Sequence, residues 1–328
     1  MPKSIIQLLL AILLLAAPPA VMAADPLWWS ESTPHAGHGE GRHSHGGPVE
    51  IKRGVYYKNL WLRAGEGPAR SRYLEEVAGA RILLATVNGE VRELAGTSLH
   101  EAYGVSFPMP EEGFYNLYLQ SESVSAGTRR VKIAKFEALK HSCREGHDHV
   151  KALLTPRYLD SLPLEIVRER LPKENFHTNL GFGDTVTFRV LRFGQPVADA
   201  EVTLATAHGW LNRARTDASG RVSFMVIRDY YPPWHEFNRR HRQDYLVTAV
   251  HATAEAGGVA ADSYSATRYL ASLSGSYHPS ARDYRSYAYG LLLGVFALSF
   301  TGGAVYFHRR LRRRPFREIR FDDQNDQN

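Results

Sequence analysis

The chain has 328 residues, of which 44% are hydrophobic, and a formal net charge of +6. This length is ample for about two domains with their own apolar cores. The single cysteine excludes an internal disulfide bond. Seven arginines and four acids follow Phe307, so three of the six excess charges belong to the C-terminal end. No recognisable nucleic-acid motif accompanies the rest, and we predict no nucleic-acid partner.

A signal peptide is predicted over residues 1–23. Lys3 gives a positive start, Ile5 to Ala17 form an apolar stretch, and small residues precede a cleavage position after Ala23 or Ala24. We therefore expect the remaining chain to enter an oxidising compartment outside the cytoplasm.

A histidine- and glycine-rich segment, 24–50, follows the signal and contains the run HAGHGEGRHSH. We expect this segment to be flexible, because its glycines do not pack into a core. Neutral imidazole is a common ligand of transition metals, and a flexible backbone lets several imidazoles converge on one ion. The predicted ligands are His35, His38, His43 and His45. The alternative is a neutral leader that binds nothing.

Residues 51–140 contain short segments that alternate apolar and polar side chains and are rich in aromatic and β-branched types. Turn signals separate them, and Asn88-Gly89 predicts a tight hairpin. We expect a first immunoglobulin-like β-sandwich. Its strands read YYKNLWLRA, RILLATVNGEVREL, YGVSFPMP, GFYNLYLQSESV and TRRVKIAKFEAL.

A second group of potential metal ligands lies in the linker 141–157, with the spacing H-x-C-x3-H-x-H. Imidazole together with a soft thiolate suits zinc, copper(I), nickel or cobalt. The predicted ligands are His141, Cys143, His147 and His149. The alternative is a solvated loop with an incidental thiol. His177 stands alone in the sequence and would join this site only if the fold brings it near His141 or His149.

Residues 158–274 carry a second series of alternating strands, with a tight turn predicted at Thr216 to Gly220. We expect a second immunoglobulin-like sandwich. The predicted fold class is therefore all-β, with two tandem immunoglobulin-like β-sandwich domains and one C-terminal transmembrane helix.

The transmembrane helix is predicted over 287–307, after a tether over 275–286, because this stretch is uncharged and about 20 apolar residues span a bilayer. An arginine-rich tail, 308–328, follows directly. By the positive-inside rule the tail lies in the cytoplasm. These features predict a single-pass inner-membrane protein with its N-terminal bulk in the periplasm.

Four motifs in the second half carry a resemblance to a known family. They are Pro163-Leu164-Glu165, Gly183-Asp184, the run from Gly194 to Val202 and the run from Thr216 to Phe224. Over about residues 160–255 the chain resembles a periplasmic domain family of cobalt/nickel ABC-type (energy-coupling-factor) uptake systems. The resemblance implies handling of nickel or cobalt beside integral membrane transporter subunits.

Together these features favour a membrane-anchored accessory protein that captures divalent nickel or cobalt and passes it to a transporter. Zinc and copper are also compatible with the ligands. No small organic substrate is evident, and we predict that the chain is not an enzyme, because hydrolase, metalloprotease, phosphate-loop and dinucleotide motifs are lacking. Two alternatives stay open: an immunoglobulin-like interaction or structural module of the envelope, and a copper or zinc homeostasis protein.

Overall fold

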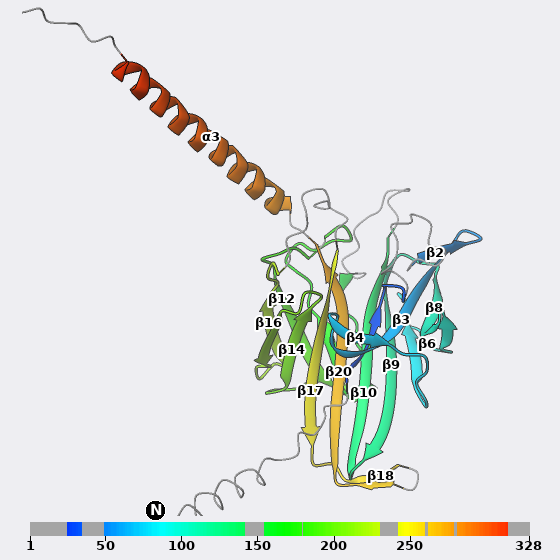
Figure 1. Ribbon diagram of the computed structural model, residues 1–328. Coiled ribbons are helices and arrows are strands. Elements are labelled where there is room, and N and C mark those ends of the chain that lie inside the picture. Colours follow the sequence, from blue (N-terminus) through cyan, green and yellow to red (C-terminus); the bar gives the residue numbers. More distant parts are fainter. Residues whose placement is uncertain are drawn as a thin grey trace, which may run out of the picture. The chain divides into compact units, whose positions relative to one another are not determined.

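The computed structural model describes residues 25–34, 49–141, 154–178, 180–229, 242–259, 262–278 and 281–313. The chain divides into two compact units, one ending at His278 and the other beginning at Pro279. Strands dominate the first unit, and one long helix forms the described part of the second (Figure 1). The predicted combination of β-sheets with a C-terminal helix is confirmed.

An eight-stranded sheet forms the middle of the first unit, in the order β15-β14-β17-β20-β10-β9-β5-β6. The first half of the chain supplies β5 (Arg81–Ala85), β6 (Val91–Leu94), β9 (Gly113–Ser125) and β10 (Thr128–Lys140). The second half supplies β14 (Glu201–Thr206), β15 (Leu211–Arg215), β17 (Gln243–Thr253) and β20 (Ala266–Tyr277). The two halves join where β10 and β20 pair in parallel.

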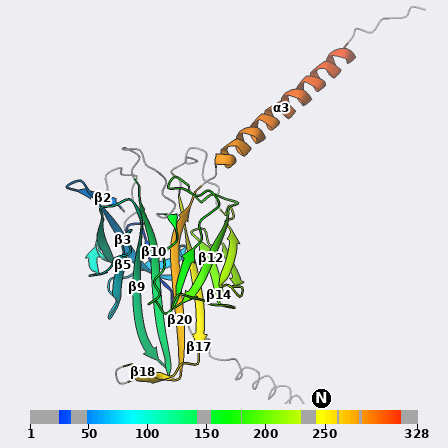
Figure 2. The same ribbon diagram turned by 180° about the vertical axis from the view of Figure 1, so that it is seen from behind.

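Two smaller sheets lie on either side of this central sheet (Figures 1 and 2). The first outer sheet contains β1 (Leu27–Ser30), β2 (Val49–Lys52), β3 (Val55–Gly67), β4 (Arg70–Tyr73), β7 (Thr97–Leu99) and β8 (Ala102–Met109). The second outer sheet contains β11 (Glu165–Arg168), β12 (Thr185–Arg192), β13 (Gln195–Pro196) and β16 (Arg221–Met225). A separate hairpin pairs β18 (Gly257–Val259) with β19 (Asp262–Tyr264).

The side chains of β10 show that the outer sheets cover opposite faces of the central sheet. Successive side chains of a strand point to opposite faces. Val131 belongs to the apolar core that contains Phe188 of β12, whereas Phe136 belongs to the core that contains Leu60 of β3. The first unit is therefore built in three layers, with one core on each face of the shared sheet.

This shared sheet differs from the predicted division into separate domains over 51–140 and 158–274. Each half of the chain contributes one outer sheet and half of the central sheet, and the two halves fall within one compact unit. Alternation predicts that a segment is a strand and which side chains share a face, but it does not specify the partner strand. The pattern therefore does not specify the parallel pairing of β10 with β20.

The segment 24–50, predicted to be flexible, contributes a strand at each end. Leu27–Ser30 forms β1 and pairs with β3, and Trp28 and Trp29 are fully buried. Val49–Lys52 forms β2, which begins within this segment and also pairs with β3. Burial of the two large indole side chains stabilises β1, and this apolar segment precedes the glycine-rich run.

Two predicted turns are confirmed. Gly89 has a φ of +86° in the turn that joins β5 to β6, where Ala85 faces Val91. Before β16, Oδ1 of Asp217 accepts the backbone amides of Ser219 and Arg221 at 2.8 and 2.9 Å. Turn chemistry thus acts locally, as the sequence indicated.

Helix α3 (Ala281–Arg312) contains the predicted span 287–307. Within it, Ala288–Arg312 reaches a mean hydropathy of 1.7. Among the described residues, this is the one helix whose length and apolar composition suffice to cross a membrane. The predicted tether over 275–286 is shorter than expected, because β20 runs to Tyr277 and α3 begins at Ala281.

Candidate functional site

Most of the predicted metal ligands lie outside the described residues. They are His35, His38, His43 and His45 of the first group, and Cys143, His147 and His149 of the linker. His141 is the predicted ligand whose surroundings the structure describes. It directly follows Lys140, the last residue of β10.

The fold brings His177 to His141. The two imidazole rings lie edge to face with their centroids 4.6 Å apart. Nδ1 of His141 lies 3.8 Å from Oε2 of Glu112, which precedes β9, and the side chain of His141 is only 10% exposed. Phe176 packs against the same ring, with the centroids 5.1 Å apart. We call His141, His177 and Glu112 the histidine corner.

A local turn places His177. The backbone amide of His177 donates a hydrogen bond to Oδ1 of Asn175 at 2.9 Å, and the hydroxyl of Thr178 donates to the same oxygen at 3.1 Å. Asparagine often folds the backbone this way, because its short side chain reaches the amide two residues on. Phe176, between them, is buried and fixes the turn against the body of the protein.

Imidazole nitrogen and carboxylate oxygen are both ligands that divalent transition metals accept. Among the described residues no group of three or more His, Cys, Asp or Glu side chains stands ready to hold a metal ion. The histidine corner supplies two neighbouring imidazoles, and the side chain of His177 is exposed.

Sequence reasoning did not select His177 as a ligand. It lies 36 positions after His141 (177 − 141) and has no other predicted ligand beside it. Only the fold, by returning the chain after β11 to the end of β10, brings the two together. Spacing arguments find ligands that are close in sequence and miss those that tertiary structure supplies.

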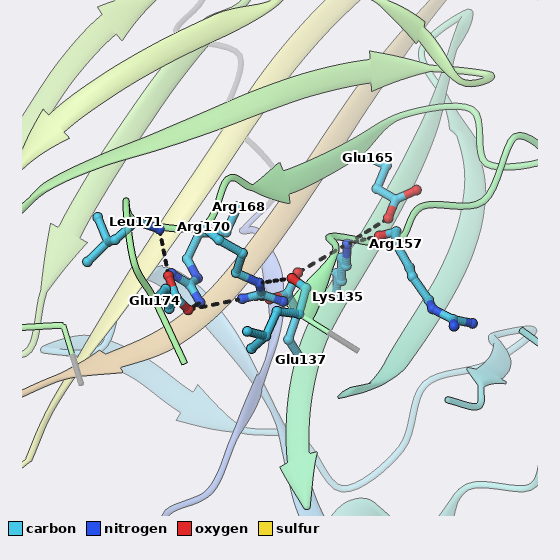
Figure 3. A network of polar contacts seen from close by, with 9 residues as sticks. Lys135, Glu137, Arg157, Glu165, Arg168, Arg170, Leu171 and Glu174 are labelled. Carbon is cyan, nitrogen blue, oxygen red and sulfur yellow. Dashed lines mark hydrogen bonds and ion pairs between the residues drawn. The ribbon is translucent and has the colours of Figure 1, made fainter. Parts of the chain in front are cut away.

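A network of six buried or partly buried charges joins the two halves of the chain (Figure 3). We call it the junction network: Lys135, Glu137, Glu165, Arg168, Arg170 and Glu174. Lys135 and Glu137 lie on β10, and the other four lie on β11 or in the loop that follows it. Its three cations balance its three anions.

Glu165, part of the Pro163-Leu164-Glu165 motif, is fully satisfied by hydrogen bonds. Nζ of Lys135 lies 2.8 Å from Oε1 of Glu165, and the two side chains are 1% and 2% exposed. The hydroxyl of Tyr118 donates to the same oxygen at 2.9 Å, and the amide of Leu159 donates to Oε2 at 2.9 Å. This motif residue therefore holds the two halves together, because a buried carboxylate is tolerated only when paired and hydrogen-bonded.

The rest of the junction network consists of charge pairs, in which Oε1 of Glu137 and Nη1 of Arg170 are buried without a hydrogen bond of good geometry among the described residues. Arg168 forms two hydrogen bonds with the Glu174 carboxylate, at 2.6 and 3.0 Å. Arg170 lies 3.0 Å from Glu137 and stacks over Phe114, with its guanidinium carbon 3.9 Å from the ring centroid. Burial tends to raise the pKa of Glu137, but the nearby positive charges outweigh it and lower that pKa to about 2.

A cavity of about 260 Å³ adjoins the junction network, and Glu137, Arg168 and Glu174 line part of its wall. In another part of the wall, Glu31 binds Lys58 and lies 2.7 Å from Arg242. Burial tends to raise the pKa of Glu31, and the two cations lower it overall. The charged side chains named here on the cavity wall are therefore paired with one another, as they are in the junction network.

Comparison with protein-family models finds no match, and comparison with curated proteins finds none either. Among solved structures the chain is similar to the BSP domain of a biofilm-associated protein, with 11% sequence identity and a TM-score of 0.16. The aligned region covers 69% of this chain and 29% of that chain.

Proposed function

We propose that this chain is a membrane-anchored metal-binding accessory protein, in which His141 and His177 hold a divalent transition metal. The observation that carries the proposal is the 4.6 Å separation of two imidazole rings from separate segments. The resemblance described above favours nickel or cobalt, and zinc or copper would accept the same ligands. The role is binding and delivery to integral membrane transporter subunits, with no catalytic step.

The proposed location is the inner membrane, with the first unit in the periplasm and α3 as the anchor. The signal predicted over 1–23 supports export, and Arg309, Arg310 and Arg312 in the last turn of α3 support a cytoplasmic C-terminus. The immunoglobulin-like character of each half of the first unit stays a prediction beside this proposal.

Capture and release at the histidine corner follow from its exposure. His141 is largely buried, whereas the side chain of His177 is exposed and therefore within reach of an ion arriving from solvent. The ligands predicted from the sequence in the linker, Cys143, His147 and His149, would complete the coordination sphere. Because a protonated imidazole cannot bind a metal ion, acid should weaken the affinity.

The test is calorimetric titration of the full chain, in phosphatidylcholine nanodiscs, with nickel chloride. His177→Ala should weaken nickel binding by about tenfold or more, because it removes a ligand rather than a neighbour of one. His208→Ala is the matched control, since His208 is also exposed but bonds Gln243 at 2.9 Å. Equal affinity in the wild-type chain and in His177→Ala contradicts the proposal.

A second variant separates the corner from the leader. Replacing His35, His38, His43 and His45 by alanine should leave the binding that depends on His177. If this variant alone abolishes binding, the leader is the site and the histidine corner is not.

A further inference from the structure

A groove of about 170 Å³ lies on the central sheet, beyond the end of β1. The hydroxyls of Ser272 and Ser274 on β20 bond the backbone carbonyls of Leu27 and Trp29, so β1 covers that part of the face. Leu270 and Arg268 point to the same face, because they lie two and four positions before Ser272. They line the groove, which begins where the first outer sheet ends.

The lining of the groove combines apolar side chains with a surplus of positive charge. Leu270, Val250 and Leu211 supply the apolar part, and Leu211 is 42% exposed. Four cations face two carboxylates, which leaves a net charge of +2 (four minus two). The charged residues are Arg130, Lys132, Arg213 and Arg268, against Glu66 and Glu201.

Two of these cations lie where they repel one another. Arg130 on β10 and Arg268 on β20 are direct partners in the parallel register, and like charges at such positions destabilise a sheet. In the described part of the chain neither arginine has a carboxylate oxygen within 4.0 Å. Arg129, one residue earlier, lies 2.6 Å from Glu122, so the strand does pair its arginines elsewhere.

Lys132 is a third positive charge in this groove, and its side chain is partly buried. Its Nζ donates a hydrogen bond to the backbone carbonyl of Asp25 at 3.0 Å. Burial lowers the pKa of Lys132, the Asp25 carboxylate opposes this, and Arg130 lowers it further. An anion in the groove would relieve the repulsion among these three side chains.

We infer that this groove binds a small organic anion, in which an apolar body carries a carboxylate, sulfonate or phosphate group. The arginines would pair with the charged group, and the leucine and valine side chains would remove the apolar body from water. The inference is independent of the proposed metal site. Arg130 and His141 are 11 positions apart on or just after β10, which is roughly 36 Å at about 3.3 Å per residue.

The experiment is calorimetric titration of the full chain, in phosphatidylcholine nanodiscs, with 1-naphthalenesulfonate, after subtraction of the heats from empty discs. Two further probes separate the contributions: 1-naphthylmethylamine keeps the apolar body with a positive charge, and inorganic sulfate keeps the negative charge alone. Both should bind at least about tenfold more weakly than the sulfonate. No binding of the sulfonate, or equal binding of the amine, overturns the inference.

Variants locate the binding. Arg130→Gln combined with Arg268→Gln should weaken sulfonate binding by at least about tenfold. Arg81→Gln combined with Arg92→Gln is the matched control on the same central sheet, because these arginines pair with Glu93 and Glu90 at 3.1 and 2.6 Å. Arg213→Gln, at an exposed position, is a second groove variant that leaves the sheet intact and should also weaken binding. Wild-type affinity in both groove variants overturns the inference.

Discussion

The positive charges of strand β10 have two kinds of surroundings. In its middle, Lys135 is 1% exposed and lies 2.8 Å from Glu165. Near its start, Arg130 is half-buried and faces Arg268, with no carboxylate oxygen within 4.0 Å among the described residues. A buried cation must be paired to offset its desolvation, whereas a cation at the surface need not be. Paired charges here hold the fold together, and unpaired ones are available to a ligand.

The largest effect should follow from breaking the paired side of this comparison. Lys135→Met leaves Glu165 and Glu137 without their shared cation, and we expect a loss of about 3–5 kcal/mol in the free energy of unfolding. Chemical denaturation of the full chain measures it. The double variant Lys135→Met/Glu165→Leu should be more stable than the single one, because it does not leave the buried Glu165 carboxylate without its cation. A loss below about 1 kcal/mol in the single variant would show that the network does not join the halves.

The junction network should also make stability depend on acid. The pKa of Glu137 is about 2 in the folded chain, against an ordinary value of 4.5. Because the folded-state pKa is the lower one, the ionised carboxylate stabilises the fold above about pH 4.5, and this is lost as the pH falls towards 2. At about 1.4 kcal/mol per pKa unit the loss is about 3 kcal/mol.

Unfolding free energies between about pH 6 and pH 2 check this expectation. Glu137→Gln should remove that part of the pH dependence, since glutamine does not titrate. Identical profiles for the two proteins would show that Glu137 is not held ionised by Arg170 and Lys135.

A smaller effect is expected from one hydrogen bond. Tyr118→Phe removes the hydroxyl that donates to Glu165 at 2.9 Å, and the free energy of unfolding should fall by about 1–3 kcal/mol. Tyr158→Phe, at a position 43% exposed, should change stability by less than about 0.5 kcal/mol. Equal effects of the two substitutions would remove Tyr118 from the network.

The smallest expected effect is a gain in stability, and it comes from the unpaired arginine near the start of β10. Arg130→Gln removes repulsion with Arg268, so the free energy of unfolding should rise by about 0.2–1 kcal/mol, and salt should reduce the gain. Arg129→Gln removes the pair with Glu122 and should lower stability by up to about 1 kcal/mol. If Arg130→Gln destabilises the chain instead, Arg130 is a structural residue like Lys135.

The sequence predicts strands and turns well where local chemistry decides them. Asn88-Gly89 and Asp217 formed their turns because glycine and aspartate act over two or three residues. It did not predict the shared sheet, although β10 carries a trace of it. Its apolar positions change from Val131 and Ile133 to Ala134 and Phe136, and these belong to different cores. That change of phase marks a strand covered on opposite faces along its length.

The candidate site was harder to predict. His141 was identified from its neighbours in sequence, but its contact with His177 depends on the loop that returns from β11. Likewise, the sequence does not distinguish Lys135 from Lys132, since both follow an apolar residue in the same strand. Their roles differ because the second outer sheet covers one face of β10 and the first outer sheet stops short on the other.

The metal proposal is tested most directly by nickel K-edge X-ray absorption on the nickel-loaded full chain. His177→Ala should lower the number of imidazole ligands by one, while His208→Ala should leave that number unchanged. The same number of imidazole ligands in the wild-type chain and in His177→Ala would contradict the metal proposal.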